Sequence, residues 1–100
     1  MMTTQKALFE LGRVVATCGA MHALQRNHAN AQAFLDRHSR GDWGVVDTED
    51  AETNDRALET GAQLLSVYEL ADGTQLWVIT DAVNAEGNRT TTTLLLPDDY

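Results

Sequence analysis

Two sets of residues in this sequence have types and spacing that could do chemistry: a cysteine near a histidine, and a dense run of carboxylates. Cys18 and His22 are four residues apart, so on a helix they share one face. A thiol beside an imidazole can form a nucleophilic thiolate or supply two zinc ligands. Two ligands do not complete a site, and neither His28 nor His38 stands at a suitable spacing. We therefore expect no metal and no catalytic residue. An enzyme using Cys18 with His22 or His38 is the least supported alternative.

The carboxylates are concentrated in residues 42–59, where seven acids stand with Arg56 as the single base. General acid catalysis needs an apolar pocket to raise one carboxyl pKa, and this run is polar. Acids on successive helical turns instead approach the charge density of nucleic-acid phosphates. The plainer alternative is a solvated helix start with acids at the positive end of the helix dipole. The predicted partner-binding residues are Asp42, Trp43, Asp47, Glu49, Asp50, Glu52, Asp55 and Glu59.

Trp43 belongs to this set because it stands in the glycine-bracketed loop Gly41-Asp42-Trp43-Gly44. Exposed tryptophans are common anchors at protein interfaces. The alternative is a loop residue that plugs the core. For Trp77, which falls in a predicted strand, we expect a core or half-buried position.

Charge is distributed unevenly along the chain. Residues 1–40 contain five basic residues and two acids, and residues 41–100 contain two basic residues and thirteen acids, for a net charge of −8. Direct binding to DNA or RNA is disfavoured, because phosphate contacts need clustered Lys and Arg. A basic protein partner fits better.

Size and hydropathy restrict the class of protein. One hundred residues with 43% hydrophobic content predict a single domain over residues 1–100. No stretch approaches the roughly 20 apolar residues that span a bilayer, and the N-terminus lacks the pattern of a secretory signal. A lone cysteine cannot form an internal disulfide, which fits the reducing cytoplasm. We expect no cofactor and no membrane partner.

The first half of the chain predicts one strand and three short helices. The strand falls within residues 8–17, and Thr17 is a suitable N-cap for a helix that ends near Arg26. Asn30 caps a second helix. Asp47 or Thr48 caps a third that runs to Glu59, with Gly61 at its C′ position. On the third helix, the residues expected to face the core are Ala51, Asp55 and Leu58, with Ala57 adjoining them.

The second half predicts a three-stranded antiparallel meander over residues 63–70, 74–80 and 90–96. Asp72-Gly73 is expected to form a type I′-like turn between the first two strands, and Pro97 ends the third. The run Thr90 to Thr93 is a candidate edge strand. The expected fold is α+β, with the opening strand added to the sheet and the helices packed on one face.

The ordered motifs resemble a family of short bacterial proteins labelled hypothetical or plasmid-related, some of which carry a type I restriction subunit label. The resemblance spans nearly the whole chain, although Cys18 stands where family members have proline. It implies a mobile-element context and brings no catalytic residues. The motifs that carry it are Leu11-Gly12-Arg13-Val14-Val15-Ala16-Thr17, Phe34-Leu35-Asp36-Arg37-His38, Gly41-Asp42-Trp43-Gly44, Asn54-Asp55-Arg56-Ala57-Leu58, Leu64-Leu65-Ser66-Val67-Tyr68, Asp72-Gly73-Thr74, Trp77-Val78-Ile79-Thr80 and Thr93-Leu94-Leu95-Leu96-Pro97.

The leading hypothesis is a small acidic accessory protein of mobile elements that binds a basic nucleic-acid enzyme. An anti-CRISPR or anti-restriction inhibitor of host defence is one form of it. The alternative is a structural or assembly module without catalytic activity that homodimerises through an edge strand.

Overall fold

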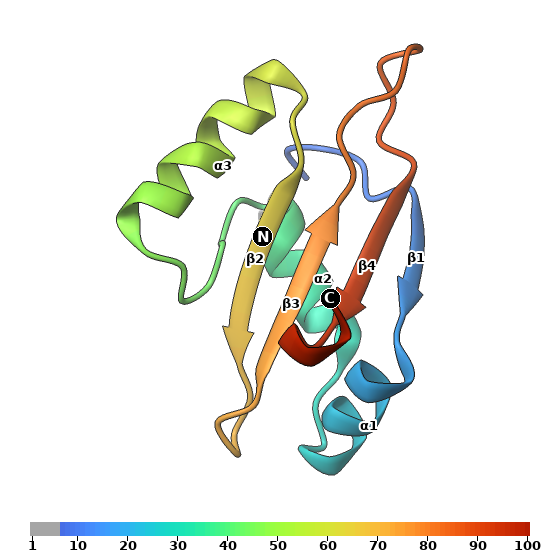
Figure 1. The fold of residues 1–100 in the computed structure, drawn as a ribbon, viewed down its shortest axis with the longest axis vertical. Helices are drawn as coiled ribbons and strands as arrows, with labels where there is room; N and C mark the ends of the chain where they lie inside the picture. Colours follow the sequence, from blue (N-terminus) through green and yellow to red (C-terminus); the bar gives the residue numbers. More distant parts are fainter. Residues whose placement is uncertain (1–6) are drawn as a thin grey trace, which may run out of the picture.

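The computed structural model describes residues 7–100, which form an α+β fold with one four-stranded sheet and three α-helices (Figure 1). The helix caps expected from the sequence are confirmed. Thr17, Asn30 and Asp47 each accept a hydrogen bond from a backbone N–H of the first turn, and Gly61 ends the third helix in the left-handed region. In chain order the elements are β1 (Arg13–Ala16), α1 (Cys18–Arg26), α2 (Ala31–Ser39), α3 (Thr48–Thr60), β2 (Leu64–Glu69), β3 (Gln75–Thr80), β4 (Thr91–Leu95) and the short 3-10 helix η1 (Pro97–Asp99).

The sheet has the order β1-β4-β3-β2. The β2-β3-β4 meander is confirmed as antiparallel, and β1 joins it parallel to β4. The opening strand joins the sheet as expected, and its parallel pairing with β4, which the sequence did not predict, makes the sheet mixed. The prediction that Thr90 to Thr93 form an edge strand is wrong, because β4 pairs on both sides. The sequence of one strand does not reveal that a segment some 80 residues away pairs with its free side.

Helices α1 and α2 cover one face of the sheet. The main core lies between this face and the two helices. The chain places η1 on the other side of the sheet, where Tyr100 packs against Trp77 with ring centroids 5.7 Å apart. Trp77 is half-buried, as expected. The core residues are Ala20, Ala23, Leu24, Leu35, Tyr68, Leu70, Leu76, Val78 and Leu94.

Helix α3 lies along the outer edge of β2 and not on the face that α1 and α2 share, which corrects part of the expected packing (Figure 1). Its buried residues are Asn54 and Ala57, whereas Asp55 is exposed. Asn54 Nδ2 donates to Leu65 O at 2.7 Å, and Leu65 N donates to Asn54 Oδ1 at 3.1 Å. The amide thus satisfies the backbone of an edge strand, which explains how a polar residue occupies the inner face.

The loop before α3 covers the same edge. Val67 N donates to Trp43 O at 3.0 Å, and Val45 N donates to Val67 O at 2.7 Å. Between them Gly44 has φ +79°, and a Cβ there would collide with the Val67 carbonyl. Only glycine permits this close approach to β2.

The β2-β3 turn differs from the expected type I′. Gly73 has φ +88° while Asp72 does not have a positive φ, and Gly73 N donates to Leu70 O at 2.9 Å. This geometry is a type I turn followed by a left-handed glycine, the usual three-residue hairpin loop. The Asp72 carboxylate accepts from Thr74 N within the turn at 3.0 Å and from Arg26 Nε at 3.0 Å.

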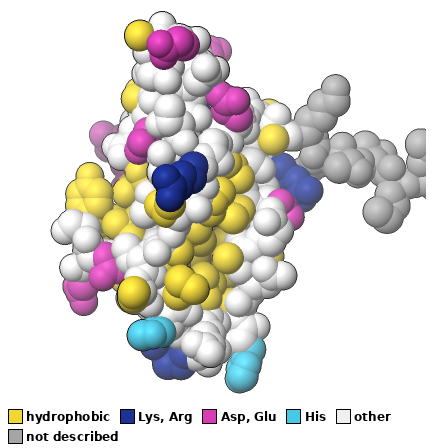
Figure 2. Space-filling view, turned by 90° about the vertical axis from the view of Figure 1, so that its right-hand side faces the viewer, with side chains coloured by type: hydrophobic (Ala, Val, Ile, Leu, Met, Phe, Trp, Pro, Cys, Tyr) yellow, Lys and Arg dark blue, Asp and Glu magenta, His cyan; other side chains and the backbone are white. Residues whose placement is uncertain are grey.

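One side of the molecule keeps hydrophobic side chains at its surface. Figure 2 shows them gathered on the side where β1 and α1 lie. Val14 is 43% exposed and Met21 is 59% exposed. Among residues 7–100, no helix has the length and apolarity needed to cross a membrane.

Candidate functional site

The acidic surface of α3 is the largest group of predicted site residues that the structure leaves accessible. Glu49, Glu52 and Glu59 are exposed, and their spacing of three and seven residues places them on the side of the helix opposite Asn54 and Ala57. Arg56 lies on the same side, where it donates to Thr53 Oγ1. Within residues 7–100, neither of the two ion pairs involves an acid of α3. The carboxylates therefore face solvent without a compensating cation in contact.

The remaining acids of the helix have local structural roles or flank this stripe. Asp47 is the N-cap and accepts from Asp50 N at 2.8 Å. Asp50 stands in the first turn, where the dipole favours a negative charge. Asp55 Oδ1 accepts from Trp43 Nε1 at 3.1 Å. Of these three, Asp47 and Asp55 help to hold α3 in place.

Trp43 is 6% exposed, so it cannot act as an exposed interface anchor. Its ring stacks on Phe9 with centroids 6.3 Å apart and meets His38 edge-on at 5.8 Å. The indole fills the space between α3, the segment around Phe9 and α2. The core-plug interpretation is therefore correct, and Trp43 leaves the candidate surface.

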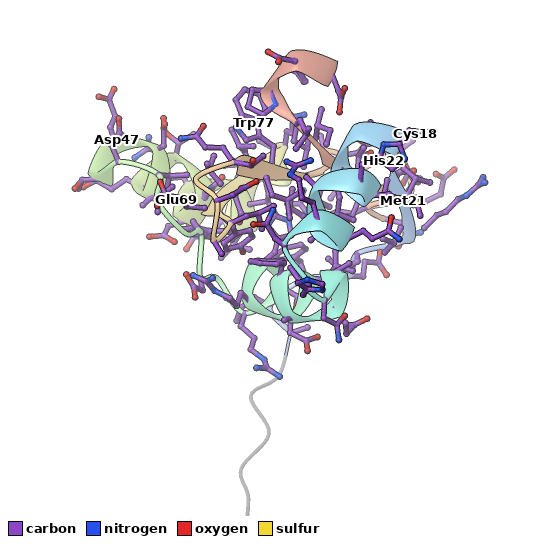
Figure 3. All side chains as sticks on the ribbon, turned by 90° about the horizontal axis from the view of Figure 1, so that it is seen from below. Cys18, Met21, His22, Asp47, Glu69 and Trp77 are labelled. Atoms are coloured by element: carbon purple, nitrogen blue, oxygen red, sulfur yellow. The ribbon has the colours of Figure 1, made fainter. Side chains whose placement is uncertain are left out.

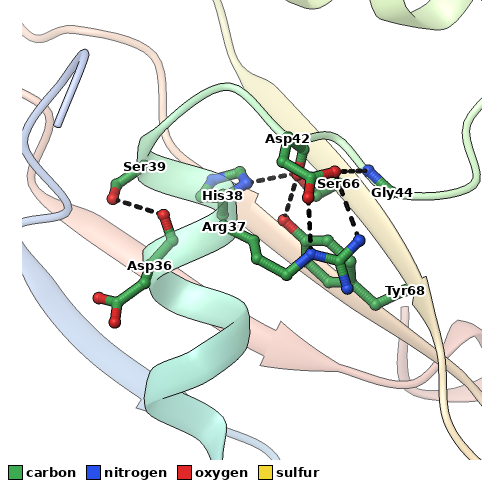
Figure 4. Close-up of polar contacts among 8 residues, drawn as sticks. All are labelled: Asp36, Arg37, His38, Ser39, Asp42, Gly44, Ser66 and Tyr68. Carbon is green, nitrogen blue, oxygen red and sulfur yellow. Dashed lines mark hydrogen bonds and ion pairs between the residues drawn. The ribbon is translucent and has the colours of Figure 1, made fainter. Parts of the chain in front are cut away.

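Asp42 forms an ion pair beside Trp43 (Figure 4). Arg37 Nε donates to Asp42 Oδ2 at 2.7 Å, and this hydrogen bond lowers the pKa of the Asp42 carboxyl and raises that of Arg37. The Arg37 guanidinium lies 4.5 Å from the centre of the Tyr68 ring, whose hydroxyl donates to Asp42 O at 2.6 Å. Burial raises the pKa of Tyr68 to about 12. The charge of Asp42 is thus balanced by Arg37, and the contacts with Arg37 and Tyr68 hold the loop in place. Asp42 is separate from the acids of α3.

The structure brings Cys18 and His22 together on α1 and places His38 elsewhere. Figure 3 shows Cys18, Met21 and His22 together on α1, at the opposite side of the molecule from Asp47. His38 is fully buried on α2 and its ring nitrogens contact hydroxyls instead. No cluster of three or more potential metal ligands occurs among residues 7–100.

His38 belongs to a buried chain of hydrogen bonds that sequence reasoning missed. Its Nδ1 lies 2.6 Å from Ser66 Oγ, and its Nε2 lies 2.8 Å from Thr80 Oγ1. Thr80 Oγ1 in turn lies 2.7 Å from Thr92 Oγ1, which donates to Leu11 O at 2.7 Å. These hydrogen bonds connect α2, β2, β3 and β4, so no local sequence pattern could predict them.

The order of donors fixes the tautomer of His38. A hydroxyl has one proton, and Thr92 uses its proton on the Leu11 carbonyl, so Thr80 must donate to Thr92. Thr80 then accepts from His38, which places the imidazole proton on Nε2 and makes Nδ1 the acceptor of the Ser66 hydroxyl. Burial, with a smaller effect of Arg89, lowers the His38 pKa to about 4. The ring is thus a neutral structural connector.

The Ser66 and His38 pair has the distance of a nucleophile and base but lacks access. Both side chains are fully buried, with exposures of 0%. A substrate would have to displace Phe9 and Trp43, whose rings meet the imidazole edge-on. The pair is therefore structural.

Arg89 is a further polar residue that the sequence did not predict to be buried. It is 6% exposed, and its guanidinium donates to Ala62 O, Asp81 O and Ala57 O at 2.7, 3.0 and 3.0 Å. Ala57 is in the last turn of α3, so the cation lies at the negative end of the helix dipole. Arg89 joins α3 to the loop after β3 and helps to fix the acidic helix.

Comparisons of the chain with protein-family models, with curated proteins and with solved structures find no match.

Proposed function

We propose that this protein is a small, non-catalytic accessory factor that binds a basic protein surface through α3. The single observation that carries the proposal is the outward stripe of Glu49, Glu52 and Glu59, which is exposed and has no contact ion pair among the described residues. Opposite charges steer such a helix toward a basic groove and raise its association rate.

Rigid attachment supports the proposal. Asn54 binds the backbone of β2, Asp47 and Gly61 cap the ends, and Arg89 holds the last turn. Thirteen residues give a helix about 20 Å long, so the carboxylates have fixed mutual positions. A rigid acidic surface loses less conformational entropy on binding than a flexible acidic tail.

The partner class that this surface fits best is a nucleic-acid enzyme with a basic groove. The acids of α3 and Asp47 place several negative charges along about 20 Å, in the manner of a phosphate backbone. Occupation of that groove would compete with DNA or RNA. Inhibition of a host-defence enzyme, within the mobile-element context that the family resemblance implies, is the biological form of the proposal.

Affinity capture with matched charge variants tests it. The tagged protein is incubated with a bacterial lysate at low and moderate salt, and bound proteins are identified by mass spectrometry. We expect a salt-sensitive nucleic-acid enzyme that the Glu49→Lys, Glu52→Lys, Glu59→Lys triple variant no longer captures. The control carries Glu69→Lys, Glu86→Lys and Asp98→Lys, which change the net charge equally at exposed positions outside α3. Equal capture by both variants would refute a role for α3.

A further inference from the structure

The two edges of the sheet differ in how the chain protects them. On β2, Asn54 occupies the backbone groups of Leu65, and the loop around Gly44 occupies those of Val67. On β1, Arg13 N and Thr17 N donate inward to Thr90 O and Leu94 O. Strand alternation therefore turns the N–H and C=O groups of Val14 and Ala16 outward, where no described residue bonds them. β1 is the edge that is open to strand addition.

The surroundings of this edge are apolar. A hollow of about 370 Å³ lies between β1 and the helices, and Val14, Ala16, Met21, Leu24, Ala29 and Ala31 line it. Val14 and Met21 are themselves exposed. Protected edges carry inward charges, prolines or bulges, and residues 14–16 of β1 have none of these. The edge and the hollow together form an apolar patch with free backbone groups.

Charge identifies the partner that fits. Arg13 stands at the start of β1, and Thr17 at its end donates to Asp99 Oδ2 at 2.6 Å. An antiparallel second copy places each Arg13 opposite Thr17 and Asp99 of the other copy, so two oppositely charged contacts form. The acidic α3 lies at the opposite edge of the sheet, next to β2. Joining two copies at β1 therefore keeps the two acidic helices farthest apart.

We infer that β1 is a self-association edge, where a second copy of this chain pairs antiparallel about a two-fold axis through Val15. The register follows from the ends of the strand. Gly12 has φ +65° and cannot continue the strand, and Thr17 is the N-cap of α1. Centring the axis on Val15 pairs Val14 of each copy with Ala16 of the other and uses all four outward N–H groups. The two sheets become one sheet of eight strands. This inference is independent of the α3 surface.

The mass in solution tests the association. Sedimentation equilibrium over about 1 to 200 μM covers the dissociation constants expected for a small interface. The wild-type mass rises from 11.0 kDa toward twice that value. Val14→Pro removes an outward N–H and keeps the protein monomeric at all these concentrations. Arg13→Glu raises the dissociation constant by roughly 10-fold, since two-fold symmetry counts each contact twice. Arg56→Glu on α3 changes the net charge equally and leaves the constant unchanged.

Disulfide trapping tests the register without depending on a proline variant that could fail to fold. In a Cys18→Ser background, Val15→Cys places two thiols in a non-hydrogen-bonded pair with Cα atoms about 4.5 Å apart, a bridging distance. Val14→Cys is the matched control. It is more exposed, yet its Cα atoms lie about 7 to 8 Å apart across the diagonal, beyond bridging distance. Oxidation therefore yields a covalent dimer for Val15→Cys and a monomer for Val14→Cys.

The failing outcomes are distinct from those of the α3 proposal. A wild-type protein that is monomeric over the whole range overturns the inference, and so does a dimer that both Val14→Pro and Arg13→Glu leave intact. Cross-linking through Val14→Cys and not through Val15→Cys overturns the register. None of these results bears on capture of a basic partner by α3.

Discussion

The buried imidazole of His38 couples the stability of the fold to pH. Its pKa is about 4 in the folded protein, against about 6.5 for an exposed histidine. Between these values the unfolded chain binds more protons, so the free energy of unfolding rises with pH. Above about pH 6.5 the imidazole does not reduce the free energy of unfolding. At lower pH its effect lowers the free energy of unfolding by about 2 kcal/mol at pH 5 and about 3 kcal/mol at pH 4. Urea unfolding at pH 7, 5 and 4 measures it.

A non-titrating variant separates His38 from the carboxylates that also titrate in this range. His38→Gln lowers stability at pH 7, because Ser66 and Thr80 lose their partner geometry, but it gives a shallower fall between pH 7 and pH 4. His22→Gln, the same substitution at an exposed position on α1, is the control for the change of side chain. Equal slopes for the wild type and His38→Gln would contradict a neutral buried imidazole.

At the scale of the elements, the junction between α3 and β2 depends on one amide. Asn54→Ala leaves the N–H and C=O of Leu65 without their partners in a partly buried position, and each unsatisfied group costs about 1 to 3 kcal/mol. We therefore expect a loss of about 2 to 4 kcal/mol in the free energy of unfolding. Thr53→Ala, one residue earlier and exposed, is expected to change it by about 0.5 kcal/mol or less. Denaturant titration of both variants checks the difference, and equal stabilities would show that the amide does not support the edge.

The elements also show what the sequence can predict. Thr17, Asn30, Asp47 and Gly61 act within a few residues of themselves, so local patterns located each helix correctly. The pairing of β1 with β4 depends on residues far apart in the chain, and the sequence therefore misplaced the open edge of the sheet.

The candidate site also contains some features that the sequence could predict and others that it could not. The acids of α3 could be identified from their density alone. The burial of Trp43 and the hydrogen bonds of Asn54 could not, because both depend on how the loop and helix dock against β2. The buried hydrogen bonds around His38 could not be predicted from the sequence for the same reason, since the hydroxyls come from three strands. Tertiary contacts decide which polar residues are inside, and composition does not.

At the scale of the whole molecule, the net charge of −8 sets the response to salt. Within residues 7–100, both ion pairs are exposed, Arg26 with Asp72 and Arg37 with Asp42, and exposed pairs contribute about 0 to 1 kcal/mol each. Repulsion among thirteen acids in residues 41–100 opposes them. Screening shortens the Debye length from about 20 Å to about 4 Å between roughly 20 mM and 500 mM salt, so it removes more repulsion than attraction. Salt is therefore expected to stabilise the fold.

Thermal unfolding followed by circular dichroism, at one low protein concentration and two NaCl concentrations, measures this effect. We expect Tm to rise by about 5 °C, which corresponds to about 1 kcal/mol for a domain of this size. The Glu49→Gln, Glu52→Gln, Glu59→Gln variant should show a smaller rise than one carrying Glu69→Gln, Glu86→Gln and Asp98→Asn, because neighbouring carboxylates on one helix repel most strongly. A fall in Tm with salt would mean that attraction dominates the surface. An equal rise in both variants would mean that the acids of α3 are not a concentrated field, and a basic partner would then have no electrostatic reason to prefer that helix.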